Sequence, residues 1–160
     1  MSRVGKQQLE IPANTTVDFT GGVFTVKGPL GSLSKVFIDT VAVTVENNIV
    51  SFSPVKNDPF SRALWGTYAS HVKNMLAGVN TPFVKKLILE GVGFKSDVKG
   101  TELHLALGFS HPVIVSIPEG LTVTAEKNNL TVTGINKELV GSFTAKVRAL
   151  KKPEPYKGKG

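Results

Sequence analysis

Two segments of the sequence carry apolar residues at the spacing of an α-helix with one buried face. In each segment they recur at positions i, i+4, i+8 and i+11. The first set is Leu64, Tyr68, Val72 and Met75, and the second is Leu139, Phe143, Val147 and Leu150. Asp58 followed by Pro59 offers an N-cap and a first-turn proline, and Asn136 offers a cap for the second segment. We therefore expect one amphipathic helix in each half of the chain.

Short runs in which apolar and polar residues alternate precede each predicted helix. A period of two is typical of half-buried β-strands. The runs are VFTVKG, VAVTVE and IVSFS in the first half and ELHLALG, PVIVSI and LTVTAE in the second. Gly-Gly, Asn-Asn, Gly-Pro and Pro-Glu-Gly separate such runs, and these sequences favour turns. The pattern indicates an α+β fold, with one helix packed on a mainly antiparallel sheet in each half.

The two halves also resemble each other in sequence. Residues 43–52 (VTVENNIVSF) align with residues 123–132 (VTAEKNNLTV) at an offset of 80. Residues 64–75 (LWGTYASHVKNM) align with residues 139–150 (LVGSFTAKVRAL) at an offset of 75. The difference falls in an intervening loop, where insertions are tolerated. We predict two duplicated modules, residues 1–81 and residues 82–150.

Four local features have competing interpretations. Gly66 and Gly141 lie inside the predicted helices, where glycine costs about 1 kcal/mol relative to alanine, so we expect close helix–sheet approach to explain them. Residues 28–31 (GPLG) fit the G-x-x-G loop of a KH module, but that loop joins two helices, and a turn containing proline is favoured. Residues 91–94 (GVGF) favour a bulge or a hairpin. Trp65 is either a core residue or a contact residue.

Positive charge is concentrated at the end of the chain. The net charge is +7, and residues 81–160 contribute +5 of it. The last fifteen residues alone carry six basic side chains against Glu154. Past Leu150 the apolar period stops, and Pro153 and Pro155 exclude a helix and favour an extended path. Residues 151–160, which we call the tail, are therefore predicted to be an extended basic arm that contacts nucleic acid, with simple disorder as the alternative.

The sequence carries few signs of other chemistry. It contains no cysteine, which favours a reducing compartment. No apolar run suits a signal peptide or a membrane span, so we expect a cytoplasmic protein. The three histidines lack metal-site spacing, and neither a G-x-S-x-G nucleophile turn nor a GxxxxGK[ST] phosphate loop is found. We expect no metal, cofactor or small-molecule substrate. A small hydrolase or anion-binding enzyme with substrate-gathering charge is the competing hypothesis.

Several motifs together resemble one family. They are SRVGK at the start, GPLG, GVGFK, LGFSHPV (residues 107–113) and RALKKPEPYKGKG at the end. The sequence resembles the bacterial-type large ribosomal subunit proteins of the L-six family over nearly its full length. The resemblance implies a duplicated α+β protein, not an enzyme, that binds ribosomal RNA in the cytoplasm near the stalk base and the factor-binding site. Its implied partners are that RNA, neighbouring ribosomal proteins and nearby translation factors.

The resemblance and the charge pattern together nominate RNA-binding residues, most of them in the second module and the tail. Motif positions suggest Lys95, Ser110, His111, Tyr156, Lys157 and Lys159. The concentration of charge around the tail adds Arg148, Lys151 and Lys152. Charge and position alone suggest four weaker candidates, Arg3, Lys6, Lys27 and Lys99. The first module is expected to face solvent, translation factors or neighbouring proteins.

Overall fold

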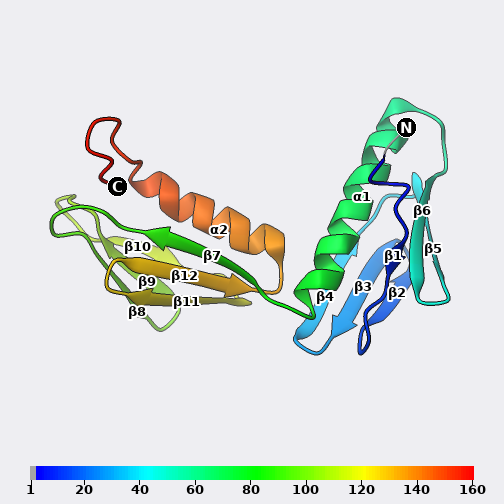
Figure 1. The fold of residues 1–160 in the computed structure, drawn as a ribbon, viewed down its shortest axis with the longest axis horizontal. Coiled ribbons are helices and arrows are strands. Elements are labelled where there is room, and N and C mark those ends of the chain that lie inside the picture. Colours follow the sequence, from blue (N-terminus) through cyan, green and yellow to red (C-terminus); the bar gives the residue numbers. More distant parts are fainter. Residues whose placement is uncertain (1–2) are drawn as a thin grey trace. The chain divides into compact units, whose positions relative to one another are not determined.

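The computed structural model describes residues 3–160, which form two compact units. The first unit ends at Pro82 and the second comprises Phe83–Gly160. Within the described residues every strand pairing is antiparallel, and each unit contains one long helix (Figure 1). The predicted α+β class is confirmed. The tail belongs to the second unit by its contacts.

The first unit contains two three-stranded sheets and helix α1 (Pro59–Gly78). One sheet has the order β2-β3-β4 and the other the order β1-β6-β5. The strands are β1 (Leu9–Glu10), β2 (Thr16–Thr20), β3 (Val23–Gly28), β4 (Gly31–Val36), β5 (Val41–Glu46) and β6 (Ile49–Pro54). The alternation in the sequence indicated one sheet for each module. The strands divide into two sheets because the consecutive strands β4 and β5 do not pair with each other, and β1 joins the second sheet by pairing with β6.

The second unit repeats this arrangement. Its sheets have the orders β8-β9-β10 and β7-β12-β11, and its helix is α2 (Lys137–Leu150). The strands are β7 (Phe83–Ile88), β8 (Lys95–Lys99), β9 (Glu102–Ala106), β10 (Val113–Ser116), β11 (Leu121–Glu126) and β12 (Asn129–Gly134). Since strand order and pairing direction match those of the first unit, the two modules are structural duplicates.

Register extends the equivalence to single residues. Val50 on β6 pairs with Leu9, and its counterpart Leu130 on β12 pairs with Leu87. The predicted helical faces are confirmed as well. Tyr68, Val72, Met75, Phe143 and Val147 are buried, and Leu64 and Leu150 are partly buried against the two cores. Leu139 is only partly buried, and its neighbour Val140 fills the core position at the start of α2.

Both helices begin at the predicted caps. The Oδ1 atom of Asp58 accepts a hydrogen bond from the backbone N–H of Ser61 at 2.6 Å, and Pro59 occupies the first turn of α1. The Oδ1 atom of Asn136 accepts from the backbone N–H groups of Glu138 and Leu139 at 3.1 and 3.4 Å. These bonds satisfy N–H groups that have no partner inside the helix.

The GPLG segment is the tight turn between β3 and β4, so the turn interpretation is confirmed and the KH interpretation is wrong. Gly28 and Gly31 pair across the hairpin. A Cβ atom on Gly28 would lie 2.6 Å from a methyl carbon of Val79, and the backbone N–H of Leu30 donates to the Val79 carbonyl oxygen at 3.1 Å. The turn is therefore packed against the end of α1.

Two other glycine expectations need correction. A Cβ atom on Gly141 would meet nothing within 4 Å, so close approach to the sheet does not explain this glycine. The GVGF segment is a turn between β7 and β8, which do not pair with each other, and so it is not a hairpin. Gly93 takes the left-handed conformation of that turn, with φ at +77°.

Candidate nucleic-acid interface

The predicted site residues of the second unit gather mostly at one end of it. Lys95 begins β8 and pairs with Ala106, the last residue of β9. The loop that follows Ala106 contains Ser110 and His111, and both are exposed. The tail, which follows the C-terminal end of α2, contacts this loop through Lys151. Three segments that are distant in the sequence therefore meet around residues 107–112.

An aromatic side chain joins the loop to the tail. The ammonium nitrogen of Lys151 lies 5.0 Å from the centroid of the Phe109 ring. The His111 ring is stacked near Phe109, with 6.3 Å between centroids and 20° between planes. Phe109 remains 45% exposed. A cation over an aromatic face is attracted by the negative charge density of that face, so Phe109 holds Lys151 at the surface.

The tail is folded back, which corrects the predicted extended arm. The backbone N–H of Glu154 donates to the Lys159 carbonyl oxygen at 3.0 Å, and that of Gly158 donates to the Glu154 carbonyl oxygen at 3.1 Å. The prolines exclude a helix but leave turns open, and Gly158 adopts a left-handed φ of +68° that lets the chain reverse. Tyr156 stands at the tip of this loop, 95% exposed.

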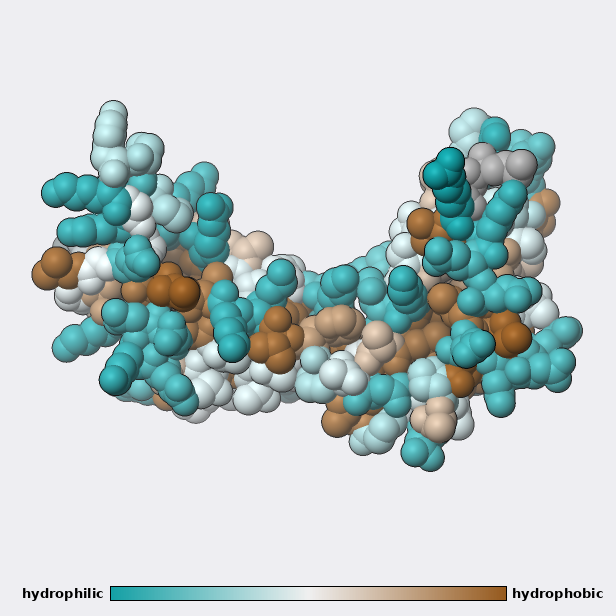
Figure 2. All heavy atoms as spheres, viewed as in Figure 1, coloured by the Kyte–Doolittle hydropathy of each residue, from teal (hydrophilic) through white to brown (hydrophobic). Residues whose placement is uncertain are grey.

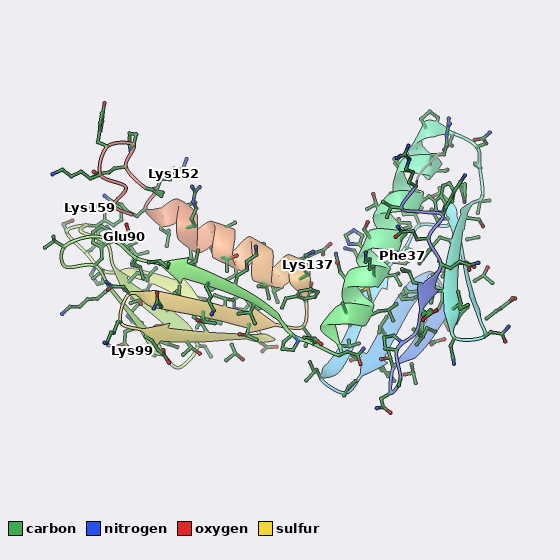
Figure 3. All side chains as sticks on the ribbon, in the orientation of Figure 1. Phe37, Glu90, Lys99, Lys137, Lys152 and Lys159 are labelled. Atoms are coloured by element: carbon green, nitrogen blue, oxygen red, sulfur yellow. The ribbon has the colours of Figure 1, made fainter. Side chains whose placement is uncertain are left out.

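The end of the tail is bound to the segment that follows β7. Glu90 and Gly160 exchange two backbone hydrogen bonds, at 2.9 and 2.8 Å. Figure 3 shows Glu90 and Lys159 close together, with Lys152 on the same part of the unit. Lys152 and Lys157 are exposed, whereas Lys159 is partly buried. The folded-back tail therefore presents Lys152, Tyr156 and Lys157 outward. Figure 2 shows mainly hydrophilic side chains around this end of the second unit.

The remaining candidates are separate from this cluster. Arg148 is exposed on the last turn of α2 and adjoins the tail, but Lys99 lies at the far end of β8 from Lys95. Arg3, Lys6 and Lys27 belong to the first unit, and all three are exposed. Arg3 and Lys6 flank Gly5, whose neighbour is Trp65 near the start of α1. Lys27 adjoins Gly28, which packs near the end of that helix, so the structure does not bring Lys27 together with the other two.

Sequence reasoning missed two residues of this interface. Phe109 lies inside the LGFSHPV motif, but a single aromatic residue in a loop is no sign of a cation partner 42 positions away. Glu90 takes part through its backbone, which every residue has. No sequence signal marked Glu90.

Other kinds of site are absent from the described part of the chain. Among residues 3–160, no three His, Asp or Glu side chains come close enough together to hold a metal ion. Within the same residues, no helix is long and apolar enough to cross a bilayer. Trp65, whose role the sequence left open, is a core residue, because its ring is buried and its Nε1 donates to the Phe52 carbonyl oxygen.

Comparison with known proteins gives one consistent family. The family described as Ribosomal protein L6 matches residues 11–81 and again residues 90–160, one match in each unit. The chain is 44% identical over 161 residues to the large ribosomal subunit protein uL6 of Opitutus terrae, covering 100% of this chain and 90% of that protein. It is 45% identical over 161 residues to the uL6 protein of Lactiplantibacillus plantarum, with the same coverage.

The duplicated α+β fold and these matches define a structural protein of the ribosome rather than an enzyme. The chain belongs to the ribosomal protein L6 family, whose matched members are proteins of the large subunit. The resemblance expected from the sequence motifs is thereby confirmed, and the hydrolase hypothesis is set aside.

Proposed function

We propose that the protein binds large-subunit ribosomal RNA through the interface formed by Lys95, the loop of residues 107–112 and the tail. The observation that supports the proposal is the meeting of these three segments, each of which carries exposed cations, aromatic rings or a hydroxyl. Lysine and arginine side chains neutralise phosphates, and aromatic rings stack on unpaired bases.

Each part of the interface has a distinct chemical role in this proposal. Lys95, Lys152, Lys157 and Arg148 meet phosphate groups. Ser110 and His111 offer hydrogen bonds to phosphate, ribose or base edges. Tyr156, with almost its entire ring in solvent, stacks on a base or packs on a sugar. Because Lys159 is partly buried, we expect it to contact phosphates less than its exposed neighbours do.

We further propose that the protein acts in the cytoplasm, near the stalk base and the factor-binding site. There the second unit would dock on RNA, and the first unit would face neighbouring proteins and translation factors. The charge distribution supports this division, because the excess of cations lies in the second half. The weaker candidates Arg3, Lys6, Lys27 and Lys99 would then make peripheral contacts at most.

A salt titration tests the RNA-binding proposal. The double variant Lys152→Ala, Lys157→Ala removes two exposed cations from the tail and leaves its backbone hydrogen bonds in place. If both meet phosphates, the log-log salt slope for binding ribosomal RNA should flatten by roughly 1.4–1.8. The matched control, Lys56→Ala with Lys73→Ala, removes two exposed cations from the first unit and should change the slope much less. Equal slopes for the two double variants would contradict the proposal.

A second titration separates stacking from charge. Tyr156→Ala should weaken binding by about 1–3 kcal/mol without changing the salt slope, because no charge is lost. Tyr156→Phe keeps the ring and should bind nearly as well as the unmodified protein. The position in the subunit is tested by a map of protein–RNA cross-links. Cross-links confined to the first unit would overturn the proposed orientation.

A further inference from the structure

The pairing of Glu90 with Gly160 has the geometry of a β-ladder. The N–H of Glu90 donates to the Gly160 carbonyl oxygen at 2.9 Å, and the N–H of Gly160 donates to the Glu90 carbonyl oxygen at 2.8 Å. Such a reciprocal exchange is the hydrogen-bonded pair of an antiparallel sheet. The preceding residue, Leu89, donates to the carbonyl oxygen of Asn128, the turn residue directly before β12. Because successive backbone groups point to opposite sides, Glu90 uses the side of the chain that β12 leaves free.

Glycine is required at position 160 for this pairing. A Cβ atom built there would lie 2.7 Å from both the Cα and the N of Pro153, and 2.9 Å from the carbonyl carbon of Lys152. These are backbone atoms, so no side-chain rotation can relieve the overlap. The last residue of the tail therefore packs directly on its beginning, and the intervening residues form a closed loop.

The closed loop contacts the unit at one further place and borders its core at another. Lys151 is held over the Phe109 ring at the start of the loop. Pro153, Gly158 and Gly160 line one side of a cavity of about 130 Å³. The other side is formed mainly by core side chains, Leu105, Leu107, Leu130 and Val147 among them. A basic tail that was only an RNA-binding tether would need neither this contact nor a place beside the core.

We propose that Gly160 and Glu90 are positioning residues, which hold the tail closed in the free protein so that Lys152, Tyr156 and Lys157 are already arranged when RNA arrives. This inference rests on the proposed RNA-binding function. A segment that is ordered before binding loses less conformational entropy on binding than a flexible one does. The closed loop would therefore raise the affinity without any contact between RNA and either Gly160 or the Glu90 side chain.

Amide hydrogen exchange resolved by NMR tests the closed loop in the free protein. The Glu90 N–H should be protected in the unmodified chain and lose its protection in Gly160→Ala. The probe for function is large-subunit ribosomal RNA transcribed in vitro. Gly160→Ala should weaken its binding by about tenfold or more, since several side chains must then be ordered on binding. The salt slope should stay unchanged, because no charge is altered.

Two further comparisons guard against a loss of fold. Gly141→Ala, in the same unit and with open space around it, is the control for adding a methyl group and should leave exchange and affinity unchanged. Glu90→Pro removes the backbone N–H that donates to the Gly160 carbonyl oxygen. Glu90→Gln keeps this N–H and removes only the side-chain charge. Glu90→Pro should reproduce the Gly160→Ala effect, and Glu90→Gln should not.

The outcomes distinguish this inference from the proposed function. A rapidly exchanging Glu90 N–H in the unmodified protein would overturn the closed loop. If Gly160→Ala loses protection of the Glu90 N–H but keeps its affinity for RNA, the closed loop does not position the tail. In that case a flattened salt slope in the Lys152→Ala, Lys157→Ala variant would still support the RNA-binding role. Unchanged binding in both variants would overturn both.

Discussion

Trp65 on α1 donates a hydrogen bond from its indole Nε1 to the backbone carbonyl oxygen of Phe52 on β6, at 2.9 Å. Both side chains belong to the core of the first unit. The equivalent helix position in the second unit, at the offset of 75, is Val140, which has no polar group to donate. The duplicated modules therefore share their packing but not this bond between helix and sheet.

Replacing Trp65 tests the importance of that bond. Trp65→Phe keeps a large aromatic ring but removes the donor, and we expect a loss of about 1–3 kcal/mol in the free energy of unfolding. Urea denaturation followed by circular dichroism measures it. Phe60→Leu, on the same helix but 59% exposed, is the control and should stay within about 0.5 kcal/mol of the unmodified protein. Equal stabilities for the two variants would show that the bond contributes nothing.

Two glycines of the second unit should respond to alanine in opposite directions. A Cβ atom on Gly141 meets open space inside α2, so Gly141→Ala should stabilise the protein by up to about 1 kcal/mol. A Cβ atom on Gly134 would lie 2.6 Å from a methyl carbon of Leu121 and 2.9 Å from one of Val140, so Gly134→Ala should destabilise it. Thermal unfolding of both variants measures the two effects. A shift of both melting temperatures in the same direction would contradict this account.

The first helix should weaken in acid through its cap. Ser61, through its side chain and its backbone N–H, lowers the pKa of the Asp58 carboxyl from its ordinary value of 3.8. The unfolded chain then binds the proton more readily than the folded one does. This contribution to stability is therefore fully present well above pH 4 and is lost as the pH falls through the lowered pKa. Asp58→Asn keeps a capping side chain that does not titrate, so its unfolding free energy should lack this component when measured from pH 6 to pH 2.

Two lysines on one strand should contribute unequally to RNA binding. Lys95 starts β8 beside the end of β9, where the loop of residues 107–112 begins, while Lys99 lies four residues away beside Glu102. Lys95→Ala should flatten the salt slope for ribosomal RNA by about 1, and Lys99→Ala should flatten it much less. The same titration measures both, and circular dichroism checks that the fold is kept. The reverse order would mean that RNA lies over the other end of the strand.

Much of the fold could be predicted because its determinants are local. The helical faces follow from residues four positions apart, and each N-cap acts on N–H groups within three residues. The duplication was visible because both modules bury the same apolar pattern. The strand runs with clear alternation, such as those of β3, β5 and β9, were predicted for the same reason. Strands such as β7, with Lys85 and Lys86 at its centre, lack that alternation and were not among the predicted runs.

The interface was predicted in part, because charge is visible in the sequence and position in space is not. The sequence pointed to the tail and to the LGFSHPV motif but treated them as separate features. The sequence also predicted an extended tail, because two prolines exclude a helix without specifying the turn that replaces it. Lys99 was a weaker candidate on charge alone, and the sequence did not show that it lies at the opposite end of β8 from Lys95.

The sequence by itself determined the class of fold, the duplication, the helix caps and the sign and place of the net charge, all of which depend on neighbouring residues or on composition. Tertiary structure decided how the strands divide into two sheets, which partner Trp65 finds, and how the tail closes. Gly160 meets Glu90 across seventy residues, and Lys151 meets Phe109 across forty-two. Backbone hydrogen bonds between distant segments have no side-chain signature, because every residue except proline offers the same N–H and C=O groups.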